Sequence, residues 1–379
     1  MTTAQTLREK FSFTSSVAAD VWSPKPNAKA YEWWYFDALS DDGRDAVVII
    51  FLDNFIFSPR YNRRKGEEEK GRRGDDFVGD ESNPQSQFPN PKSSVPAVAF
   101  TYYRDGKSIY RSINEFGGDE FSASASAPEC KIGNNFFKFE SAPYGSGYLI
   151  SITASLRKSC TLEAQFEWLA IESDFLPDKA IGERDAHVWN LVVSRADVSG
   201  KITLRNEKGK ESNTVHFRGT GYHDHNYDNR WLPETVQDWQ WGRAHFTDCS
   251  AVFYRYKESG EATGATKLFT IRNGELHEGN AEYNEQQFAR DIFGIRYPQR
   301  LTFLTEDNMR LRVKQTKIID SSFFYLRFLS EMTLTLRDGK PRKAIGITEY
   351  LNPKALKYRW LDWLVSMRIG RDGKGSFLP

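Results

Sequence analysis

Apolar and polar residues follow one another in short, often alternating runs along most of the chain. Residues 161–169 show this most clearly, because Leu162, Ala164, Phe166 and Trp168 alternate with Glu and Gln side chains. A period of two predicts a β-strand with one buried face. Comparable runs predict further strands at 46–51, 95–103, 108–113, 136–139, 148–155, 192–204, 251–256, 267–272, 300–304, 309–315, 332–336 and 344–350. Many short strands at even spacing indicate a sandwich or barrel.

Turn signals divide these strands into hairpins and the chain into two halves. Asp105-Gly106, Asn273-Gly274 and Asp338-Gly339 are turn dipeptides that favour β-hairpins. A polar turn at 205–213 separates two β-rich halves of similar size. We therefore predict a mostly β protein with two related domains, residues 1–215 and 216–379.

Two segments depart from the strand pattern. Residues 58–94 are rich in charged, Pro, Asn and Gln residues and poor in apolar ones, which predicts a mobile loop. This loop is either a lid over a barrel mouth or a solvated insertion. Residues 353–367 place apolar side chains on one helical face, at Leu356, Trp360, Trp363, Leu364 and Met367. We predict a short C-terminal helix that packs on the second barrel, with contact to a membrane surface as the alternative.

Composition narrows the possible partners. The chain has 52 basic and 51 acidic residues, so neither nucleic acid nor an acidic membrane is predicted as the main partner. Its three Cys residues form no metal-binding or disulfide spacing, and no signal peptide or membrane-spanning run is visible. These features favour a cytoplasmic protein. Aromatic residues make up 14% of the chain, as suits β-strands and apolar pockets.

The first cluster of candidate functional residues is Tyr31-Glu-Trp-Trp-Tyr-Phe-Asp37. In a strand, Glu32, Trp34 and Phe36 face one side and the residues between them face the other. A Glu desolvated by large rings can retain a proton and act as a proton donor. The alternative is a surface Glu beside two packed Trp side chains.

The second cluster, at residues 218–227, contains Tyr222, His223, Asp224, His225 and Asn226. His-x-His with an Asp can bind zinc, and two His residues spaced by two share one face of a strand. No third ligand with metal spacing accompanies them, so we predict no metal. A hydrogen-bonded network at a pocket rim, suited to acid–base chemistry, is the preferred interpretation.

The third cluster is Asp238-Trp-Gln-Trp-Gly-Arg-Ala-His245, in which Trp239, Trp241 and Arg243 share one strand face. Indole rings stabilise a nearby cation, so this face suits a polyene or a carbocation formed from it. Two core Trp residues beside a surface Arg are the alternative. A weaker cluster of the same kind spans residues 185–190. Nucleotide-binding, serine-hydrolase and zinc-protease motifs are missing from the sequence.

Four blocks together resemble the carotenoid 1,2-hydratase-like (AttH-like) family. They are Glu32-Trp-Trp-Tyr-Phe36, Gly221-Tyr-His-Asp-His-Asn226, Trp239-Gln-Trp-Gly-Arg243 and Thr348-Glu-Tyr350. The resemblance implies two lipocalin-like β-barrel or sandwich domains and activity without a cofactor. It includes hydratases that add water to the end double bond of acyclic carotenoids, and a similar fold in fungal Diels–Alderases. It also implies a carboxylate in the strand after the Trp block, where this chain has Phe253-Tyr254-Arg255-Tyr256.

The sequence thus predicts a cofactor-free enzyme that protonates an alkene of a hydrophobic polyene or isoprenoid, followed by hydration, cyclisation or isomerisation. An intramolecular Diels–Alderase acting on a polyketide polyene and a non-catalytic carrier of an apolar ligand are the alternatives. The predicted catalytic residues are Asp224, His225, Glu32 and His223. The predicted substrate-binding residues are Trp34, Tyr222, Asn226, Trp239, Trp241, Arg243 and Tyr254.

Overall fold

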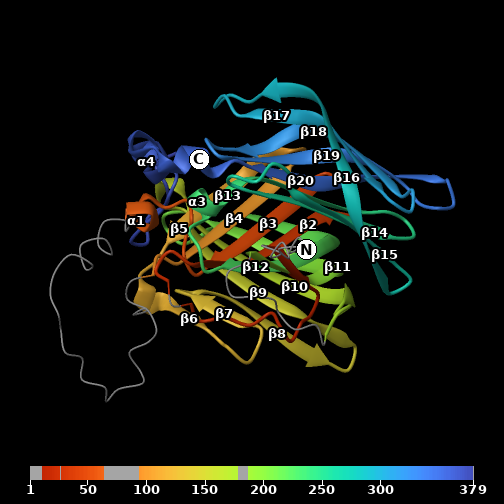
Figure 1. Cartoon of the computed structure of the whole chain (residues 1–379). Helices are drawn as coiled ribbons and strands as arrows, with labels where there is room; N and C mark the ends of the chain where they lie inside the picture. The colour runs from red at the N-terminus through yellow and green to blue at the C-terminus, as the bar shows by residue number, and fades with distance from the viewer. Residues whose placement is uncertain (1–10, 26, 64–93, 178–186, 379) are drawn as a thin grey trace, which may run out of the picture.

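The computed structural model describes residues 11–25, 27–63, 94–177 and 187–378 (Figure 1). Within them the chain forms a large curled sheet and a closed barrel, which confirms the predicted mostly β fold. The sheet strands are β1 Phe11–Thr14, β2 Tyr31–Ser40, β3 Asp45–Leu52, β4 Ala97–Arg104, β5 Lys107–Glu115, β6 Phe121–Ala123, β7 Glu129–Ile132, β8 Asn135–Ala142, β9 Gly145–Ser155, β10 Thr161–Ser173, β11 His187–Arg205 and β12 Glu211–Asp228.

The barrel follows in sequence and closes on itself through pairing of its first and last strands. Its strands are β13 Val236–His245, β14 Ser250–Glu258, β15 Ala265–Arg272, β16 Glu275–Arg290, β17 Arg296–Thr305, β18 Arg310–Ser321, β19 Tyr325–Thr335 and β20 Pro341–Leu351. The helical segments are short: α1 Pro59–Asn62, α3 Leu232–Thr235, α4 Asp362–Ser366, and the 3₁₀ turns η4 Gly118–Glu120, η5 Arg157–Ser159, η6 Pro353–Lys357 and η7 Arg359–Leu361.

Strand order in the sheet brings distant segments together. The order is β5-β4-β3-β2-β12-β11-β10-β9-β8-β7-β6, so β12 lies between β2 and β11. Neighbours along this order pair antiparallel, whereas β1 pairs with β11 in parallel. In the register of β2 and β12, Trp34 is opposite His225 and Tyr35 is opposite Asp224. Two predicted clusters therefore meet in adjacent strands.

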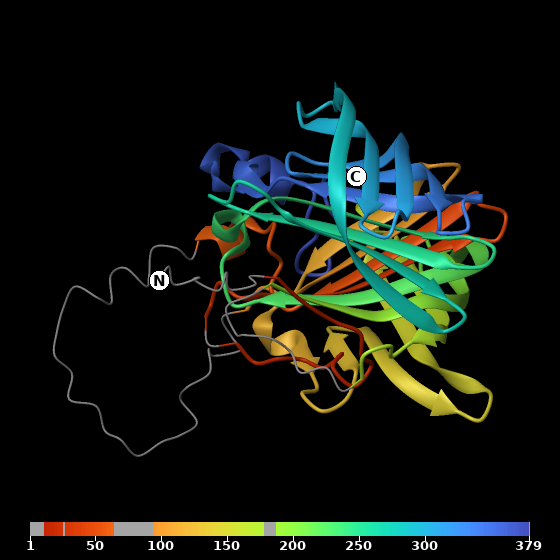
Figure 2. The same ribbon diagram turned by 45° about the vertical axis from the view of Figure 1, so that its right-hand side comes forward.

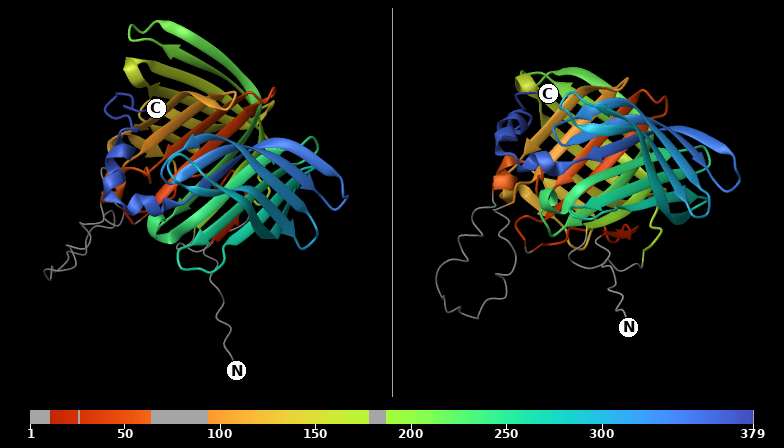
Figure 3. Two further views of the ribbon diagram at one scale, coloured as in Figure 1. Left: turned by 90° about the horizontal axis from the view of Figure 1, so that it is seen from above. Right: turned by 45° about the horizontal axis from the view of Figure 1, so that its top comes forward.

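The sheet has two covered faces. One face curls around its own core, which contains Trp34, Phe36, Tyr148 and Trp168. The other face packs against the barrel through a second core that contains Trp33, Tyr35, Trp239 and Trp241, as the two views of sheet and barrel indicate (Figures 2 and 3). Because both faces are buried, every residue of β2 from Tyr31 to Ala38 is buried, and the side chains alternate between the two cores.

Several turns follow directly from the sequence. In the β4–β5 hairpin, Asp105 and Gly106 have φ of 51° and 65°, and in the β15–β16 hairpin, Asn273 and Gly274 have φ of 54° and 78°. Two successive positive φ values are those of a type I′ turn, which Asn-Gly and Asp-Gly favour. These two hairpins are confirmed.

The predicted domain boundary lies inside a strand of the structure. Residues 215 and 216 both belong to β12, which continues in the sheet to Asp228. The change from sheet to barrel falls between Asp228 and Val236, the last residue of β12 and the first of β13. Most of the predicted loop, residues 64–93, lies outside the described residues. Its first residues differ from the prediction, because Ser58 caps α1, and Pro59 and Tyr61 are buried.

The predicted C-terminal helix is shorter and differently oriented than expected. Residues 353–367 form η6, η7 and α4 in succession, with Pro353 at the start of η6. A 3₁₀ turn has three residues per turn, so a face laid out with the α-helical period does not stay on one side. Leu356 and Leu361 are consequently buried, whereas Trp360 and Trp363 are 67% and 60% exposed. The prediction of one apolar helix face packed on the barrel is therefore wrong for these two Trp residues.

Candidate functional site

Strand β12 presents polar side chains to both faces of the sheet. Tyr222, Asp224 and Asn226 point toward the barrel, where the first two contact the core between sheet and barrel. His223 and His225 point into the curl of the sheet, where they stack on Phe36 and Trp34. Asp224 and His225, both predicted acids, thus belong to two separate buried polar clusters.

The Asp224 cluster lies between sheet and barrel. The Trp189 indole N–H and the Tyr222 hydroxyl donate hydrogen bonds to Asp224 Oδ2, at 3.0 Å and 2.8 Å. The Asn226 amide donates to Oδ1 at 2.8 Å. Among the described residues, no Lys or Arg forms an ion pair with this carboxyl group. Burial raises the pKa of Asp224 to about 8, against the two hydrogen bonds to Oδ2, which lower it. Asp224 therefore holds a proton at neutral pH.

His187 lies beside this cluster and links the sheet to the barrel. Its Nε2 is 2.7 Å from the Tyr254 hydroxyl on β14, and its Nδ1 is 3.3 Å from the Tyr31 hydroxyl. Burial, with the charge of Arg230, lowers the pKa of His187 to about 3. The ring is therefore neutral, so one of its nitrogens can donate a hydrogen bond while the other accepts one.

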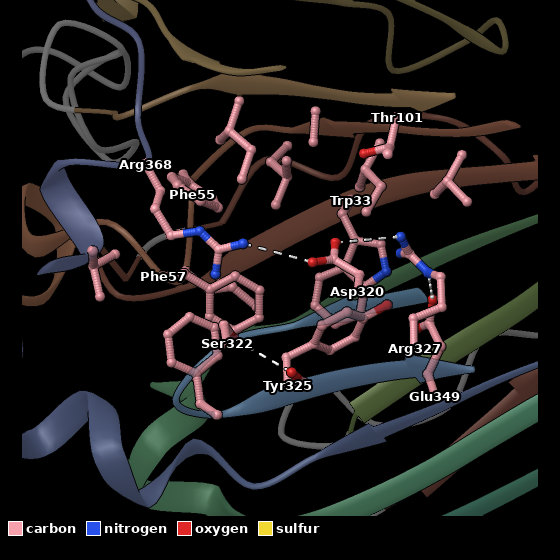
Figure 4. Close-up of a pocket in the computed structure, with 18 of the residues that line it drawn as sticks. Trp33, Phe55, Phe57, Thr101, Asp320, Ser322, Tyr325, Arg327, Glu349 and Arg368 are labelled. Carbon is pink, nitrogen blue, oxygen red and sulfur yellow. Dashed lines mark hydrogen bonds and ion pairs between the residues drawn. The ribbon is translucent and has the colours of Figure 1, made fainter. Parts of the chain in front are cut away.

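A cavity lies between β2–β5 of the sheet, β18–β20 of the barrel and the C-terminal segment (Figure 4). The space not filled by protein atoms in this cavity and at its mouth, open solvent included, is about 1060 Å³. Aromatic and aliphatic side chains form most of its wall, among them Trp33, Tyr35, Phe55, Phe324 and Trp239. Such a wall suits a long apolar ligand.

One side of the cavity is charged. Asp320 lies 3.4 Å from Arg111, 3.7 Å from Arg368 and 3.9 Å from Arg327, and Arg327 also pairs with Glu349 at 2.8 Å. Figure 4 shows Arg368, Asp320, Arg327 and Glu349 joined by ion pairs that run between the aromatic side chains. The cavity thus combines an apolar wall with a chain of charged groups.

Aromatic side chains separate the cavity from Asp224. Tyr35 lines the cavity, and its ring centroid is 5.3 Å from that of Trp241 and 6.4 Å from that of Tyr222. Tyr222 donates to Asp224. Trp33 and Trp239 also line the cavity and pack on each other at 5.7 Å. The inner end of the cavity is therefore a ring-lined wall, and Tyr222 lies between the Tyr35 ring of this wall and the protonated carboxyl group.

The second polar cluster is enclosed within the curl of the sheet. Asp20 lies 3.0 Å from His223 Nε2 and 3.2 Å from His225 Nδ1, and it accepts a hydrogen bond from Tyr148 at 2.5 Å. His225 Nε2 lies 2.7 Å from Glu32, which also pairs with Lys25. Of these six residues, none lines the cavity described above.

The charges of this cluster stabilise one another. Burial alone lowers the pKa of His225, but its hydrogen bonds to Asp20 and Glu32 outweigh burial and raise the pKa to about 9. Burial alone raises the pKa of Asp20, but the charges and hydrogen bonds of His223 and His225 outweigh it and lower the pKa to about 2. No group of three or more His, Cys, Asp or Glu side chains among the described residues has a metal-binding arrangement.

Comparison with protein families decides the family of the chain. Residues 172–377, more than half of its length, match the model of the family described as carotenoid hydratase CrtC. The chain belongs to the CrtC carotenoid hydratase family. The matched region of this CrtC-family chain runs from the end of β10 to the C-terminal segment and includes Asp224, His187 and the whole barrel. The predicted resemblance is confirmed.

Two relatives of this CrtC-family chain have names that refer to carotenoids. A protein of Chlorobaculum tepidum named hydroxyneurosporene dehydrogenase is 28% identical over 371 residues, which cover 96% of this chain and 93% of the relative. The acyclic carotenoid 1,2-hydratase of Thiocapsa roseopersicina is 26% identical over 258 residues, which cover 65% of this chain and 53% of that hydratase.

Solved structures share the fold. An AttH-like protein from Nitrosomonas europaea matches with a TM-score of 0.52 at 14% identity, over 85% of this chain and 92% of that protein. CghA in complex with Sch210972 matches with a TM-score of 0.53 at 11% identity, over 89% of this chain and 97% of CghA. At these identities the likeness is one of fold.

All eleven predicted site residues of the CrtC-family chain are buried, but they do not form one site. Asp224, Tyr222, Asn226, Trp241 and Tyr254 lie between sheet and barrel, and Trp239 lines the cavity. Arg243 is on the same side, where its Nε donates to Asp37 at 2.7 Å. Glu32, Trp34, His223 and His225 lie on the opposite face of the sheet, away from the cavity.

Two residues that contact the acid or its neighbours were only weakly indicated by the sequence. His187 and Trp189 belong to the weaker cluster at residues 185–190, and their spacing by two already placed them on one strand face. The pairing of β11 with β12 brings Leu191 opposite Asp224 and Trp189 opposite Asn226, which sets the indole against the carboxyl group. The charged residues of the cavity come from β5, β18, β19, β20 and the C-terminal segment, and of them only Glu349 belongs to a block that the sequence analysis singled out.

Proposed function

We propose that this protein is a cofactor-free enzyme that protonates an alkene of an apolar polyene bound in the cavity between sheet and barrel. The observation that carries the proposal is the Asp224 carboxyl group, which is buried, lacks a cationic partner among the described residues and retains a proton at neutral pH. A general acid needs its pKa near the working pH, and this environment provides it. Membership of the carotenoid hydratase family supports a polyene as the substrate.

The proposed chemistry requires the Tyr35 and Tyr222 side chains, which lie between the cavity and Asp224, to move aside, after which the Asp224 proton is transferred to one carbon of the alkene. The neighbouring carbon becomes a carbocation, which the cavity-lining rings of Trp33 and Trp239 stabilise through their quadrupoles. In hydration, water adds to the cation and its released proton returns to the carboxylate. Loss of a different proton to the carboxylate gives isomerisation. Attack by a second double bond forms a ring and a new cation, and loss of a proton from that cation to the carboxylate completes cyclisation. Tyr222 and Trp189 hold the carboxyl group in position for each of these outcomes.

Pericyclic catalysis is a second candidate that one observation favours. Asp224 does not line the cavity, whereas Arg111, Tyr325 and Arg368 do, and these side chains can donate hydrogen bonds to a bound ligand. A pericyclase acts mainly by holding a reactive conformer, so shape and a few donors would suffice. The Asp224→Asn experiment in the Discussion separates the two mechanisms.

The first prediction is that turnover falls as the pH rises. Asp224 donates a proton only while it is protonated, so kcat/KM should be full below about pH 8 and fall as the pH rises through that value. The measurement is product formation from a linear polyene in detergent micelles over a series of pH values. A rate that stays constant well above pH 8 would argue against a carboxylic acid with this pKa as the proton donor.

The second prediction concerns the aromatic wall. Trp239→Leu should weaken polyene binding roughly tenfold, because one ring that lines the cavity and packs on Trp33 is removed. Quenching of the remaining indole fluorescence by the polyene gives the affinity. Trp34→Phe is the matched control, since Trp34 lies on the other face of the sheet and the variant should bind normally. Equal losses in the two variants would place the ligand elsewhere.

A further inference from the structure

Exposed apolar side chains gather on the side of the molecule where the cavity reaches the surface. Of the eleven large apolar residues that are exposed among the described residues, seven belong to this group. They form what we call the apolar face: Ile109, Phe288, Ile292, Phe293, Tyr358, Trp360 and Trp363.

Two adjoining surface grooves connect the members of the apolar face. Ile109, Ile292 and Phe293 line one groove, and Phe288, Phe293 and Tyr358 line the next, so that Phe293 belongs to both. Trp360 and Trp363 follow Tyr358 in the same C-terminal segment, which Figures 1 and 3 show at one edge of the molecule with α4 beside α1. Clustering of this extent marks an interaction surface.

The chemistry of the apolar face matches a lipid bilayer carrying negative charge. Trp360, Trp363 and Tyr358 are 67%, 60% and 56% exposed, and amphipathic rings of this kind favour the bilayer–water interface. Lys354, Lys357 and Arg359 are exposed in the same C-terminal segment. The one acidic residue of the segment 353–367, Asp362, lies 3.3 Å from Arg63. Exposed cations among Trp and Tyr attract anionic head groups.

The apolar face also adjoins the cavity. The groove under Ile109, Ile292 and Phe293 is lined by Arg111, Asp320 and Arg368, and the same three residues line the inner cavity. One layer of side chains therefore separates the surface groove from the ligand cavity. No helix among the described residues is long and apolar enough to cross a membrane.

We propose that the apolar face docks on the surface of an anionic bilayer and that the apolar substrate passes from lipid into the cavity past Arg111, Asp320 and Arg368. The proposed docking is inferred from the exposed residues alone and does not depend on the proposed function. The passage of substrate rests on the proposed function, because only an apolar substrate would be dissolved in the bilayer.

Vesicle sedimentation tests the docking. The wild-type chain should bind phosphatidylcholine vesicles that contain phosphatidylglycerol, and bind pure phosphatidylcholine vesicles more weakly. Lys357→Gln and Arg359→Gln should each weaken binding to the anionic vesicles about fivefold. The double variant Trp360→Ser and Trp363→Ser should lose most binding to both kinds of vesicle. Tyr144→Ser is the matched control, because Tyr144 is 84% exposed outside the apolar face and its loss should leave binding unchanged.

The outcomes separate docking from catalysis. Turnover of polyene in detergent micelles should be unchanged in the double Trp variant, while Asp224→Asn should still bind vesicles. Failure of the wild type to sediment with anionic vesicles, or wild-type binding by the double Trp variant, would overturn the docking and leave the proposed reaction standing. Self-association in the absence of lipid that the same Trp substitutions abolish would show that a second copy covers this face, and would also overturn it.

Discussion

The Asp224→Asn variant is expected to bind its polyene with wild-type affinity and to lose about 100- to 10,000-fold of its turnover. Asn has the size and shape of Asp, and it can still accept hydrogen bonds from Trp189 and Tyr222. It cannot supply the proton that forms the carbocation. Binding is measured by fluorescence quenching and turnover by product formation in detergent micelles.

Tyr222→Phe provides the matched control for this result. The Tyr222 hydroxyl lowers the pKa of Asp224, so its removal should raise that pKa further and shift the pH limb of turnover to higher pH. A purely structural role of Asp224 would not produce this displacement. Normal turnover in Asp224→Asn would exclude Asp224 as the acid and favour the pericyclase, which needs no strong acid.

The pH dependence of the unfolding free energy gives a third test of the Asp224 carboxyl group. The folded-state pKa of Asp224 is about 8, far above the ordinary value near 3.9, so the folded chain keeps a proton that the unfolded chain releases. Its contribution to stability is complete below about pH 4 and is lost as the pH rises toward 8. Asp224→Asn should remove this part of the pH dependence of the unfolding free energy, whether or not the protein turns over a substrate.

Alternation along single strands was the most informative part of the sequence. It correctly placed Glu32 and Trp34 opposite Trp33 and Tyr35, set His223 beside His225, and put Trp239 with Trp241 on one face. Each of these inferences uses only the period of two within one strand. Positive-φ turns at Asp105 and Asn273 could likewise be read from the dipeptides that contain them.

The sequence did not indicate which face of each strand packs into which of the two cores. A half-exposed strand shows its solvent face as alternating polar residues, but β2 from Tyr31 to Ala38 and β12 from Gly221 to Asn226 are covered on both faces. Asp224 and His225 therefore looked like one cluster, although the sheet separates them. Asp20 was not predicted as a site residue, because the segment before β2 has no periodic pattern of apolar and polar residues. Arg111, Asp320 and Arg368 look like ordinary solvated charges until three distant segments meet at the cavity.

Asp20→Asn should cost about 3–5 kcal/mol of unfolding free energy near neutral pH, since breaking a buried ion pair leaves its partner uncompensated. Asp20 is fully buried and contacts His223, His225 and Tyr148. Its removal leaves a charged His225 with Glu32 as its remaining partner, and Glu32 already pairs with Lys25. Urea unfolding of wild type and variant measures the difference.

The pH dependence distinguishes this network from simple loss of packing. The folded pKa of Asp20 is about 2, below its ordinary value, so its contribution is present above about pH 4 and is lost as the pH falls toward 2. The folded pKa of His225 is about 9, above its ordinary value near 6.5, so its contribution is complete below that value and is lost as the pH rises through 9. The loss of unfolding free energy caused by Asp20→Asn should therefore be largest between about pH 4 and 6.5 and become smaller at lower and higher pH.

Asp197→Asn, at an exposed position of β11, is the control and should change stability little at any pH. A cost for Asp20→Asn that is constant with pH would mean that the network acts through packing rather than through charge.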